Sequence, residues 1–314
     1  MKIGFLFPGQ GAQSLRMGKD LYDKYEEYKK VYYEVEKITG VKVSDLTFNS
    51  TEEELSQTKN TQICILTMSL AILKLLVKQG IKADSSIGLS LGEYAALVSS
   101  NAISFEDGVK IVKKRGELMQ NFCPDGNWSM AAILGLEEKD VIKVCDETDG
   151  FVVPVNFNCP GQIVISGQKD VVDRAMENMK KAGAKRCLEL KTSGPFHTEK
   201  LQEASNELRK ELDKISINNF SHKVIKNLDG KEYKDSDNIK DILSCHITNP
   251  VRFEQGIQTM IDMGIDTFIE IGPGKTLTGF VKRINKDVNL LNVNDDQSLE
   301  NLVSFISNGG KVNE

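Results

Sequence analysis

The sequence predicts an α/β fold in which a parallel-rich core carries a smaller inserted unit. Short apolar strands alternate with helical segments in the first and last thirds of the chain, which is typical of a parallel sheet covered by helices. The motif Gly88-Leu89-Ser90-Leu91-Gly92 stands between one such strand and helix, with the spacing of a nucleophile elbow. Between residues 128 and 190 the predicted order becomes β-α-β-β-α-β, which indicates a separate small unit.

The first third begins with a buried-type strand over residues 2–7, which ends at the loop Pro8-Gly9-Gln10-Gly11. This loop is not a dinucleotide fingerprint, because Ser14 stands where the third glycine would fall. Its glycines leave backbone N–H groups accessible, as an oxyanion hole requires of a loop beside a nucleophile. The pattern then predicts a charged amphipathic helix over 17–38 and an apolar core helix over 61–77.

Ser90 is predicted to lie on a tight turn between a strand end at 83–87 and a helix that starts at 93. The flanking glycines fit such an elbow because the turn leaves no room for a Cβ atom. The helix N-terminus would direct its free N–H groups and its dipole toward the serine. The alternative is an ordinary glycine-rich turn with a solvated serine, and the strand–turn–helix context favours the nucleophile. Ser104 then caps a helix that runs to residue 122.

The middle of the chain predicts the inserted unit. A breaker cluster, Pro124-Asp125-Gly126-Asn127, opens it, so we place the insert at 125–191 and the core at 1–124 and 192–314. The six predicted elements are strand 128–134, helix 137–147, strand 152–158, strand 162–166, helix 169–182 and strand 186–190.

The last third returns to the core pattern. Gly272-Pro273-Gly274-Lys275-Thr276 is not a phosphate-binding loop, because Ile269 stands where its first glycine is needed. The predicted elements are a helix over 198–215, a short strand over 224–227, a helix that ends at Asn249-Pro250, a helix over 253–263, a strand over 267–271 and a final helix over 298–306.

Composition restricts the possible functions. The chain has 314 residues and a formal net charge of −5, which does not favour a nucleic-acid partner. No apolar run reaches the roughly 20 residues of a membrane span, and the apolar start is too short for a signal segment. Six scattered cysteines without a CxxC pair argue against a zinc site and a disulfide framework. We therefore expect a cytoplasmic, monomeric protein without a metal or another cofactor.

A serine hydroxyl needs a base that takes its proton, and the chain has three histidines. His197 lies in a loop with Gly194 and Pro195 at the edge of the insert, where a rigid scaffold could position it. His222 has polar neighbours and is expected to be exposed, whereas His246 precedes the Asn-Pro breaker. No acidic residue stands out as a third member of a triad.

Several motifs, in order, resemble those of malonyl-CoA:acyl carrier protein transacylases and of polyketide synthase acyltransferase domains. The resemblance covers about residues 1–290 and implies an α/β-hydrolase-like core with a ferredoxin-like insert, and no cofactor beyond the thioester substrate. The motifs are Phe7-Pro8-Gly9-Gln10-Gly11, Gly88-Leu89-Ser90-Leu91-Gly92-Glu93-Tyr94, Arg115-Gly116-Glu117-Leu118-Met119-Gln120, Pro154-Val155-Asn156-Phe157-Asn158, Pro195-Phe196-His197, Asn249-Pro250-Val251 and Glu270-Ile271-Gly272-Pro273-Gly274.

The resemblance implies catalytic roles for four positions. Ser90 would carry the malonyl ester, and His197 would act first as general base and then as the acid that protonates the leaving thiol. The main-chain N–H groups of Gln10 and Leu91 would form the oxyanion hole.

The resemblance also implies binding roles. Arg115 would pair its guanidinium with the malonyl carboxylate, and Gln62 and Asn158 would lie near the site. The main-chain carbonyl of His246 would orient the catalytic histidine, although relatives often carry glutamine there. Leu89, where many relatives have histidine, would alter the polarity of the pocket and leave the mechanism unchanged.

The implied partners are malonyl-CoA and an acidic, phosphopantetheinylated acyl carrier protein. Because this chain is itself net negative, carrier binding requires a local basic patch, for which the candidates are Lys185, Arg186, Lys191 and Lys275. The sequence is also compatible with three alternatives: a trans-acting acyltransferase of polyketide synthesis, a serine thioesterase or hydrolase, and a non-catalytic carrier-binding protein.

Overall fold

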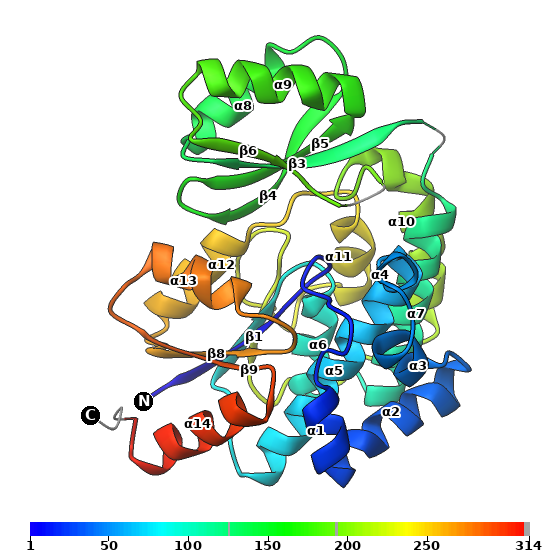
Figure 1. Ribbon diagram of the computed structural model, residues 1–314, viewed down its shortest axis with the longest axis vertical. Helices are drawn as coiled ribbons and strands as arrows, with labels where there is room; N and C mark the ends of the chain where they lie inside the picture. The colour runs from blue at the N-terminus through cyan, green and yellow to red at the C-terminus, as the bar shows by residue number, and fades with distance from the viewer. Residues whose placement is uncertain (125, 192–193, 311–314) are drawn as a thin grey trace.

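The computed structural model describes residues 1–124, 126–191 and 194–310, and in it two sheets lie one above the other (Figure 1). The larger sheet has the order β7-β2-β1-β8-β9, and all of its pairings are parallel. Its strands are β7 (Lys223–Ile225), β2 (Ser85–Gly88), β1 (Ile3–Phe7), β8 (Thr267–Ile271) and β9 (Asn289–Val293).

Alternate side chains of the parallel strands enter two separate hydrophobic cores, which explains why these strands are apolar throughout. Phe5 and Phe7 pack on one face with helices α5 and α6, and α7 packs against α5. Leu6 points to the opposite face, where it packs with residues of α12 and α13. The bounds are α5 (Thr58–Lys78), α6 (Gly92–Ser99), α7 (Phe105–Asn121), α12 (Phe253–Asp262) and α13 (Thr276–Ile284).

The single helix predicted over 17–38 is two helices in the structure. Tyr25 separates them with an extended backbone (φ −115°, ψ 110°), and the side chains of Lys24 and Tyr25 both bind Asp296 at this bend. The prediction also omitted α3 and the strand β9. The other helices around the larger sheet are α1 (Lys19–Lys24), α2 (Glu26–Thr39), α3 (Val43–Phe48), α4 (Glu52–Leu55), the 3₁₀ turn η1 (Glu199–Leu201), α10 (Gln202–Asp213), α11 (Ile239–His246) and α14 (Asp296–Ser307).

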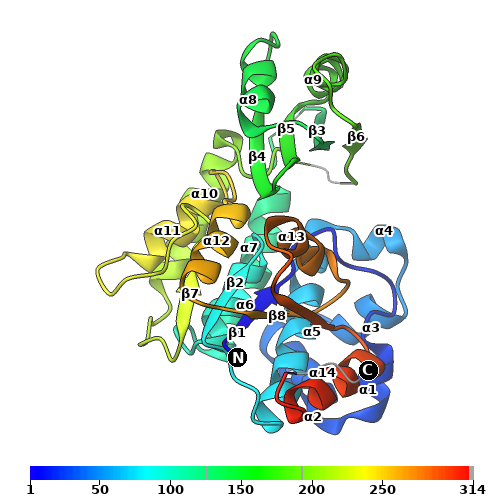
Figure 2. The ribbon, with the colours of Figure 1, turned by 90° about the vertical axis from the view of Figure 1, so that its left-hand side faces the viewer.

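The smaller sheet is antiparallel, with the order β4-β5-β3-β6. Helices α8 and α9 cover the face turned away from the larger sheet (Figures 1 and 2). All six elements predicted for this segment are confirmed to within two residues. Their bounds are β3 (Trp128–Leu134), α8 (Glu138–Asp146), β4 (Val152–Cys159), β5 (Gln162–Gln168), α9 (Lys169–Lys181) and β6 (Arg186–Glu189).

Val251 joins the two parts of the molecule. Its N–H donates to the carbonyl of Val155 at 2.8 Å, and its carbonyl accepts from the N–H of Phe157 at 2.9 Å, so it extends the smaller sheet beside β4. The guanidinium of the next residue, Arg252, lies 3.9 Å from the centre of the Phe157 ring and pairs with Glu138. The smaller sheet is therefore fixed to the loop that follows α11.

The sequence predicts no membrane span, and helix α5 is the segment that most resembles one. By length and composition α5 is apolar enough to cross a membrane, and in the described residues it is the one such helix. Of its most apolar window, 83% is buried inside the protein. This burial is that of a core helix.

Candidate active site

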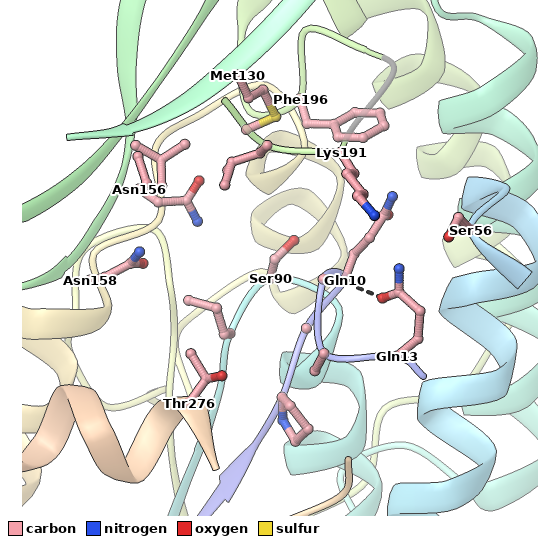
Figure 3. Close-up of a pocket in the computed structure, with 18 of the residues that line it drawn as sticks. Gln10, Gln13, Ser56, Ser90, Met130, Asn156, Asn158, Lys191, Phe196 and Thr276 are labelled. Atoms are coloured by element: carbon pink, nitrogen blue, oxygen red, sulfur yellow. Dashed lines mark hydrogen bonds between the residues drawn. The ribbon is translucent and has the colours of Figure 1, made fainter. Parts of the chain in front are cut away.

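The loops that follow the parallel strands converge at one edge of the larger sheet, on either side of β1. Open α/β sheets commonly bind ligands at this edge, outside the carboxyl ends of the strands. A cavity of about 650 Å³ lies there, between the larger sheet and the smaller one. Ser90 lies near the centre of the cavity, with Asn158 on one side and Lys191 and Phe196 on the other (Figure 3).

The turn that carries Ser90 is tight enough to require both of its glycines. A Cβ atom on Gly88 would lie 1.8 Å from the carbonyl carbon of Gly92, and one on Gly92 would lie 2.0 Å from the carbonyl oxygen of Phe7. Ser90 itself has φ 52°, in the left-handed region that a non-glycine residue rarely adopts. Such backbone strain persists only where the surroundings enforce it, and it concentrates at functional sites.

Asn227, which follows β7, holds this strained turn from the side. Its Oδ1 accepts from the N–H of Ser90 at 2.7 Å, and its Nδ2 donates to the carbonyl of Gly88 at 2.6 Å. The side-chain amide therefore bridges the two backbone groups that flank the bend. Asn227 is fully buried, so water does not compete for these bonds.

His197 faces Ser90, with 2.8 Å between its Nε2 and the serine Oγ. Its Nδ1 lies 3.0 Å from the carbonyl oxygen of His246 and 3.1 Å from that of Asn249. Carbonyl oxygens only accept hydrogen bonds, so Nδ1 carries the ring proton and Nε2 presents its lone pair to the serine. His197 also has a left-handed backbone, with φ 61°. The pair is thus arranged for transfer of the serine proton to the imidazole.

Arg115 lies on the other side of the serine hydroxyl and is almost completely buried, with 1% of its surface exposed. Its Nη2 donates to the Oγ of Ser90 at 3.0 Å, and its Nη1 donates to the Oε1 of Gln62 at 2.7 Å. Burial lowers the pKa of Arg115, but an arginine remains protonated at neutral pH. The described part of the chain places no carboxylate in ion-pair contact with this guanidinium. A cation without a direct counter-ion therefore lies next to the serine.

The backbone around the serine also supplies hydrogen-bond donors. Leu91 precedes the first residue of α6, and Gln10 lies in the loop after β1 that lines the cavity. In the described residues, neither Leu91 N–H nor Gln10 N–H has an acceptor. Two such donors beside a nucleophile can stabilise negative charge on a carbonyl oxygen under attack.

Comparison with known proteins establishes the family. The model of the acyl transferase domain matches residues 4–310. This chain belongs to the acyl transferase family. It is 43% identical over 302 residues to the malonyl CoA-acyl carrier protein transacylase of Bacillus subtilis, covering 95% of each protein. It is 37% identical to the enzyme of the same name from Staphylococcus aureus, covering 98% of this chain and 99% of the relative.

Solved structures agree with this assignment. The malonyl CoA-acyl carrier protein transacylase of Clostridium perfringens superposes with a TM-score of 0.94 at 46% identity, and the alignment covers 98% of both chains. A malonyl-transacylase in complex with a type II polyketide synthase acyl carrier protein superposes with a TM-score of 0.93 at 35% identity, covering 97% of this chain and 99% of that one. The chain is therefore an acyltransferase.

The structure also locates the other residues predicted for this acyltransferase. Gln62 lines the cavity and binds Arg115, and Asn158 lines it with a buried Oδ1 that has no partner in the described residues. Leu89 is another lining residue. His246 is buried at the end of α11, and its carbonyl contacts His197 as the resemblance implied.

The expectation that His222 is exposed is wrong. Its Nε2 contacts the hydroxyl of Ser86 at 3.0 Å and that of Ser99 at 3.3 Å, and burial lowers its pKa to about 4. Its polar neighbours in the sequence, Ser221 and Lys223, are exposed and misled the prediction.

The sequence did not predict roles for three residues at the site. Asn227 binds the turn that carries Ser90, Asn249 contacts the ring of His197, and Glu93 lies behind the site. The signal for Asn227 was present, because it stands at the carboxyl end of a predicted strand, where parallel sheets place functional groups. Asn249 acts through its main-chain carbonyl, for which side-chain chemistry gives no signal.

The environment of His197 sets the pH range over which it can act as a base. Burial is the largest effect and lowers the pKa of His197 well below 6.5, and electrostatic interactions with the neighbouring His246 ring and the Arg115 guanidinium lower it further. The two backbone carbonyls on Nδ1 oppose this shift. The ring therefore stays neutral through the range in which a free histidine becomes protonated.

We expect Ser90 to keep its reactivity in mildly acidic solution. The rate of fluorophosphonate labelling at pH 5.5 should stay within about threefold of its value at pH 8, whereas an ordinary histidine base would cause a loss of about tenfold. Melting temperatures at each pH serve as the control. Because the folded pKa of His197 is depressed, its contribution to stability is present above pH 6.5 and is lost as the pH falls below it. A tenfold loss of labelling in protein that remains folded at pH 5.5 would contradict the prediction.

Proposed function

We propose that this acyltransferase is a malonyl-CoA:acyl carrier protein transacylase of fatty acid synthesis. It would move the malonyl group from coenzyme A to Ser90 and then to the phosphopantetheine thiol of a carrier protein. The names of its relatives support this choice, because those at 37–43% identity are malonyl CoA-acyl carrier protein transacylases.

The observation that supports a malonyl substrate is the position of Arg115. Its guanidinium lies 3.0 Å from the serine oxygen and has no carboxylate in ion-pair contact among the described residues. Burying an unpaired charge is unfavourable, so a bound carboxylate would relieve it. Gln62 fixes one end of the guanidinium, and a planar fork presents two parallel N–H donors to a carboxylate. An acyl group with a free carboxylate, such as malonyl, meets this requirement.

In the first half of the reaction, His197 Nε2 takes the proton of Ser90, and Oγ attacks the carbonyl carbon of the thioester. The N–H groups of Gln10 and Leu91 would stabilise the resulting oxyanion. When the tetrahedral intermediate collapses, the C–S bond breaks and His197 returns the proton to the thiolate of coenzyme A. The products are CoA-SH and malonyl-Ser90.

In the second half, the thiol of the carrier's phosphopantetheine arm gives its proton to His197 and attacks the ester carbon. The bond to Ser90 Oγ breaks, and His197 returns the proton to the serine. Water must not attack the ester, since hydrolysis would waste the acyl group. The cycle requires no metal or organic cofactor, and we propose none.

Intact-protein mass spectrometry tests this proposal. After mixing with malonyl-CoA, the protein should gain the mass of one malonyl group, and this mass should disappear when a phosphopantetheinylated carrier is added. A serine thioesterase or hydrolase would share Ser90 and His197 but would release malonate without a carrier. Malonate release as fast as transfer would therefore favour hydrolysis. A carrier of polyketide synthesis, added in parallel, tests the polyketide alternative.

The carrier would approach the mouth of the cavity, and the structure separates the four candidate cations. Lys191 lines the cavity, and Lys275 is exposed beside the lining residue Thr276. Lys185 and Arg186 lie at the far end of β6, where Arg186 pairs with Leu134. We therefore restrict the proposed basic patch to Lys191 and Lys275.

Reversing both charges, in Lys191→Glu with Lys275→Glu, should raise the KM for the carrier protein about 3- to 10-fold, because rim charges act mainly on the encounter of acidic and basic surfaces. Steady-state kinetics at two salt concentrations measure this effect, which should shrink at high salt. The matched control is Lys185→Glu with Arg186→Glu, which also reverses two exposed charges, but away from the mouth. An equal effect of this control, or no effect of Lys191→Glu with Lys275→Glu, would rule out the patch.

We also infer finer features of the architecture and setting. The parallel sheet with its serine elbow supports an α/β-hydrolase-like core at 1–124 and 192–314, and the order β-α-β-β-α-β supports a ferredoxin-like insert at 125–191. We further propose that the protein acts as a monomer in the cytoplasm, a setting that its scattered cysteines favour.

A further inference from the structure

A buried carboxylate behind the site lies against Asn227 and His246, the residues that hold the Ser90 turn and the His197 ring. Glu93 lies in the first turn of α6, where an acidic side chain ordinarily lies at the surface and interacts with the helix dipole. Here it is fully buried, with 0% of its surface exposed. A buried carboxylate is unfavourable unless it is hydrogen-bonded or paired, so its partners indicate what it does.

One oxygen of Glu93 supports the serine turn. Its Oε1 accepts from the hydroxyl of Tyr233 at 2.6 Å and from the N–H of Asn227 at 3.3 Å. Burial raises the pKa of Tyr233 well above its usual value, so its hydroxyl remains a donor. The side chain of the same Asn227 accepts a hydrogen bond from the N–H of Ser90. Glu93 therefore holds Asn227, and Asn227 in turn holds the turn that carries Ser90.

The other oxygen of Glu93 faces the histidine side. Its Oε2 lies 3.1 Å from the Nδ1 of His246, at ion-pair distance but not aligned for a hydrogen bond. The ring of His246 is buried against that of His197, with 5.0 Å between the ring centres. The carbonyl of His246 accepts from Nδ1 of His197. The carboxylate thus contacts the residue that orients the base.

We propose that Glu93 is a positioning residue. It fixes the position of Asn227, which holds the Ser90 turn, relative to that of His246, which orients the base His197. This inference rests on the proposed roles of Ser90 and His197. A displacement of about 1 Å between reacting groups can slow a reaction about a hundredfold, so loss of this carboxylate reduces reactivity without touching the substrate.

The test is the rate at which a fluorophosphonate labels Ser90, measured together with kcat and KM for malonyl-CoA. Glu93→Ala removes both acceptors and should lower labelling and kcat about a hundredfold, with KM changed by less than about threefold. Glu93→Gln keeps a carbonyl acceptor for Tyr233 and Asn227 and should recover most of the loss. Tyr233→Phe removes only a hydroxyl, keeps the ring stacked on Phe220, and should lower labelling about tenfold.

The matched control is Glu270→Ala. Glu270 is also fully buried and accepts from the N–H groups of Leu277 and Thr278, with no contact to the Ser90–His197 pair among the described residues. This variant should melt at a lower temperature than wild type, but Ser90 should be labelled at a rate within about twofold of wild type. Labelling at the wild-type rate in folded Glu93→Ala would overturn the proposal. If Glu93→Ala does not fold, unchanged labelling in Tyr233→Phe would do the same. No rescue by Glu93→Gln, or an equal loss in Glu270→Ala, would also overturn the proposal. If wild type labels normally but takes up no malonyl group, the proposed function fails instead.

Discussion

Ser90→Ala should leave no malonyl adduct after exposure to malonyl-CoA, whereas wild type should carry one malonyl group on Ser90. His197→Ala should keep the nucleophile but slow transfer about 10²–10⁴-fold, which is the usual contribution of a general base. The reason is the 2.8 Å contact between Nε2 and Oγ, which makes His197 the acceptor of the serine proton. Peptide mapping of the adduct and transfer rates with a carrier protein measure both effects.

A second serine–histidine contact in the molecule provides the control. Ser99 lies 3.3 Å from the Nε2 of His222, outside the cavity, so Ser99→Ala should acylate at the wild-type rate. Cys123 and Cys159 are the competing nucleophiles. Burial raises the pKa of both thiols, so neither is a reactive thiolate at neutral pH. A malonyl adduct on either cysteine would refute the assignment of Ser90.

The elements that sequence alone predicted well are those with local determinants. The elbow follows from two glycines placed two residues on either side of Ser90, because backbone crowding within that turn decides it. The smaller sheet was predicted to within two residues because its strands alternate with strongly amphipathic helices between clear breakers. In contrast, β9 is a short, partly exposed edge strand with the sequence Asn-Leu-Leu-Asn-Val, in which polar and apolar residues do not alternate, so the pattern gave no strand prediction.

The contacts that complete the site could not be predicted, because they join residues far apart in the chain. Asn227 is hydrogen-bonded to the N–H of Ser90, which lies 137 positions earlier in the chain, and Tyr233 is hydrogen-bonded to Glu93, 140 positions earlier. Glu93 looked like an ordinary acidic residue in a first helical turn, and only the packing of α6 under the β7 loop shows that it is buried. Arg115 presented the same difficulty, since the helix that carries it also carries the more exposed Lys113 and Lys114.

Wild type should prefer malonyl-CoA to acetyl-CoA by roughly 30- to several-thousand-fold in kcat/KM. Acetyl leaves the buried Arg115 without a carboxylate, and losing one partner of a buried charge pair costs about 2–5 kcal/mol, at about 1.4 kcal/mol per tenfold. Arg115→Ala should remove the malonyl advantage and raise acetyl transfer, since the unpaired charge is gone. The measurement is kcat/KM for both thioesters in wild type and variant.

Two further variants separate recognition of the carboxylate from a general effect of charge. Arg115→Lys should recover only part of the malonyl preference, because an ammonium cannot reproduce the two parallel bonds of the guanidinium. Lys114→Ala removes a cation from the same helix, but its side chain is 43% exposed and pairs with Glu117, so the malonyl preference should not change. If Arg115→Ala lowered both substrates equally, Arg115 would support the site through its bonds to Ser90 and Gln62 alone. The geometry would then give no reason to choose malonyl over any other acyl group.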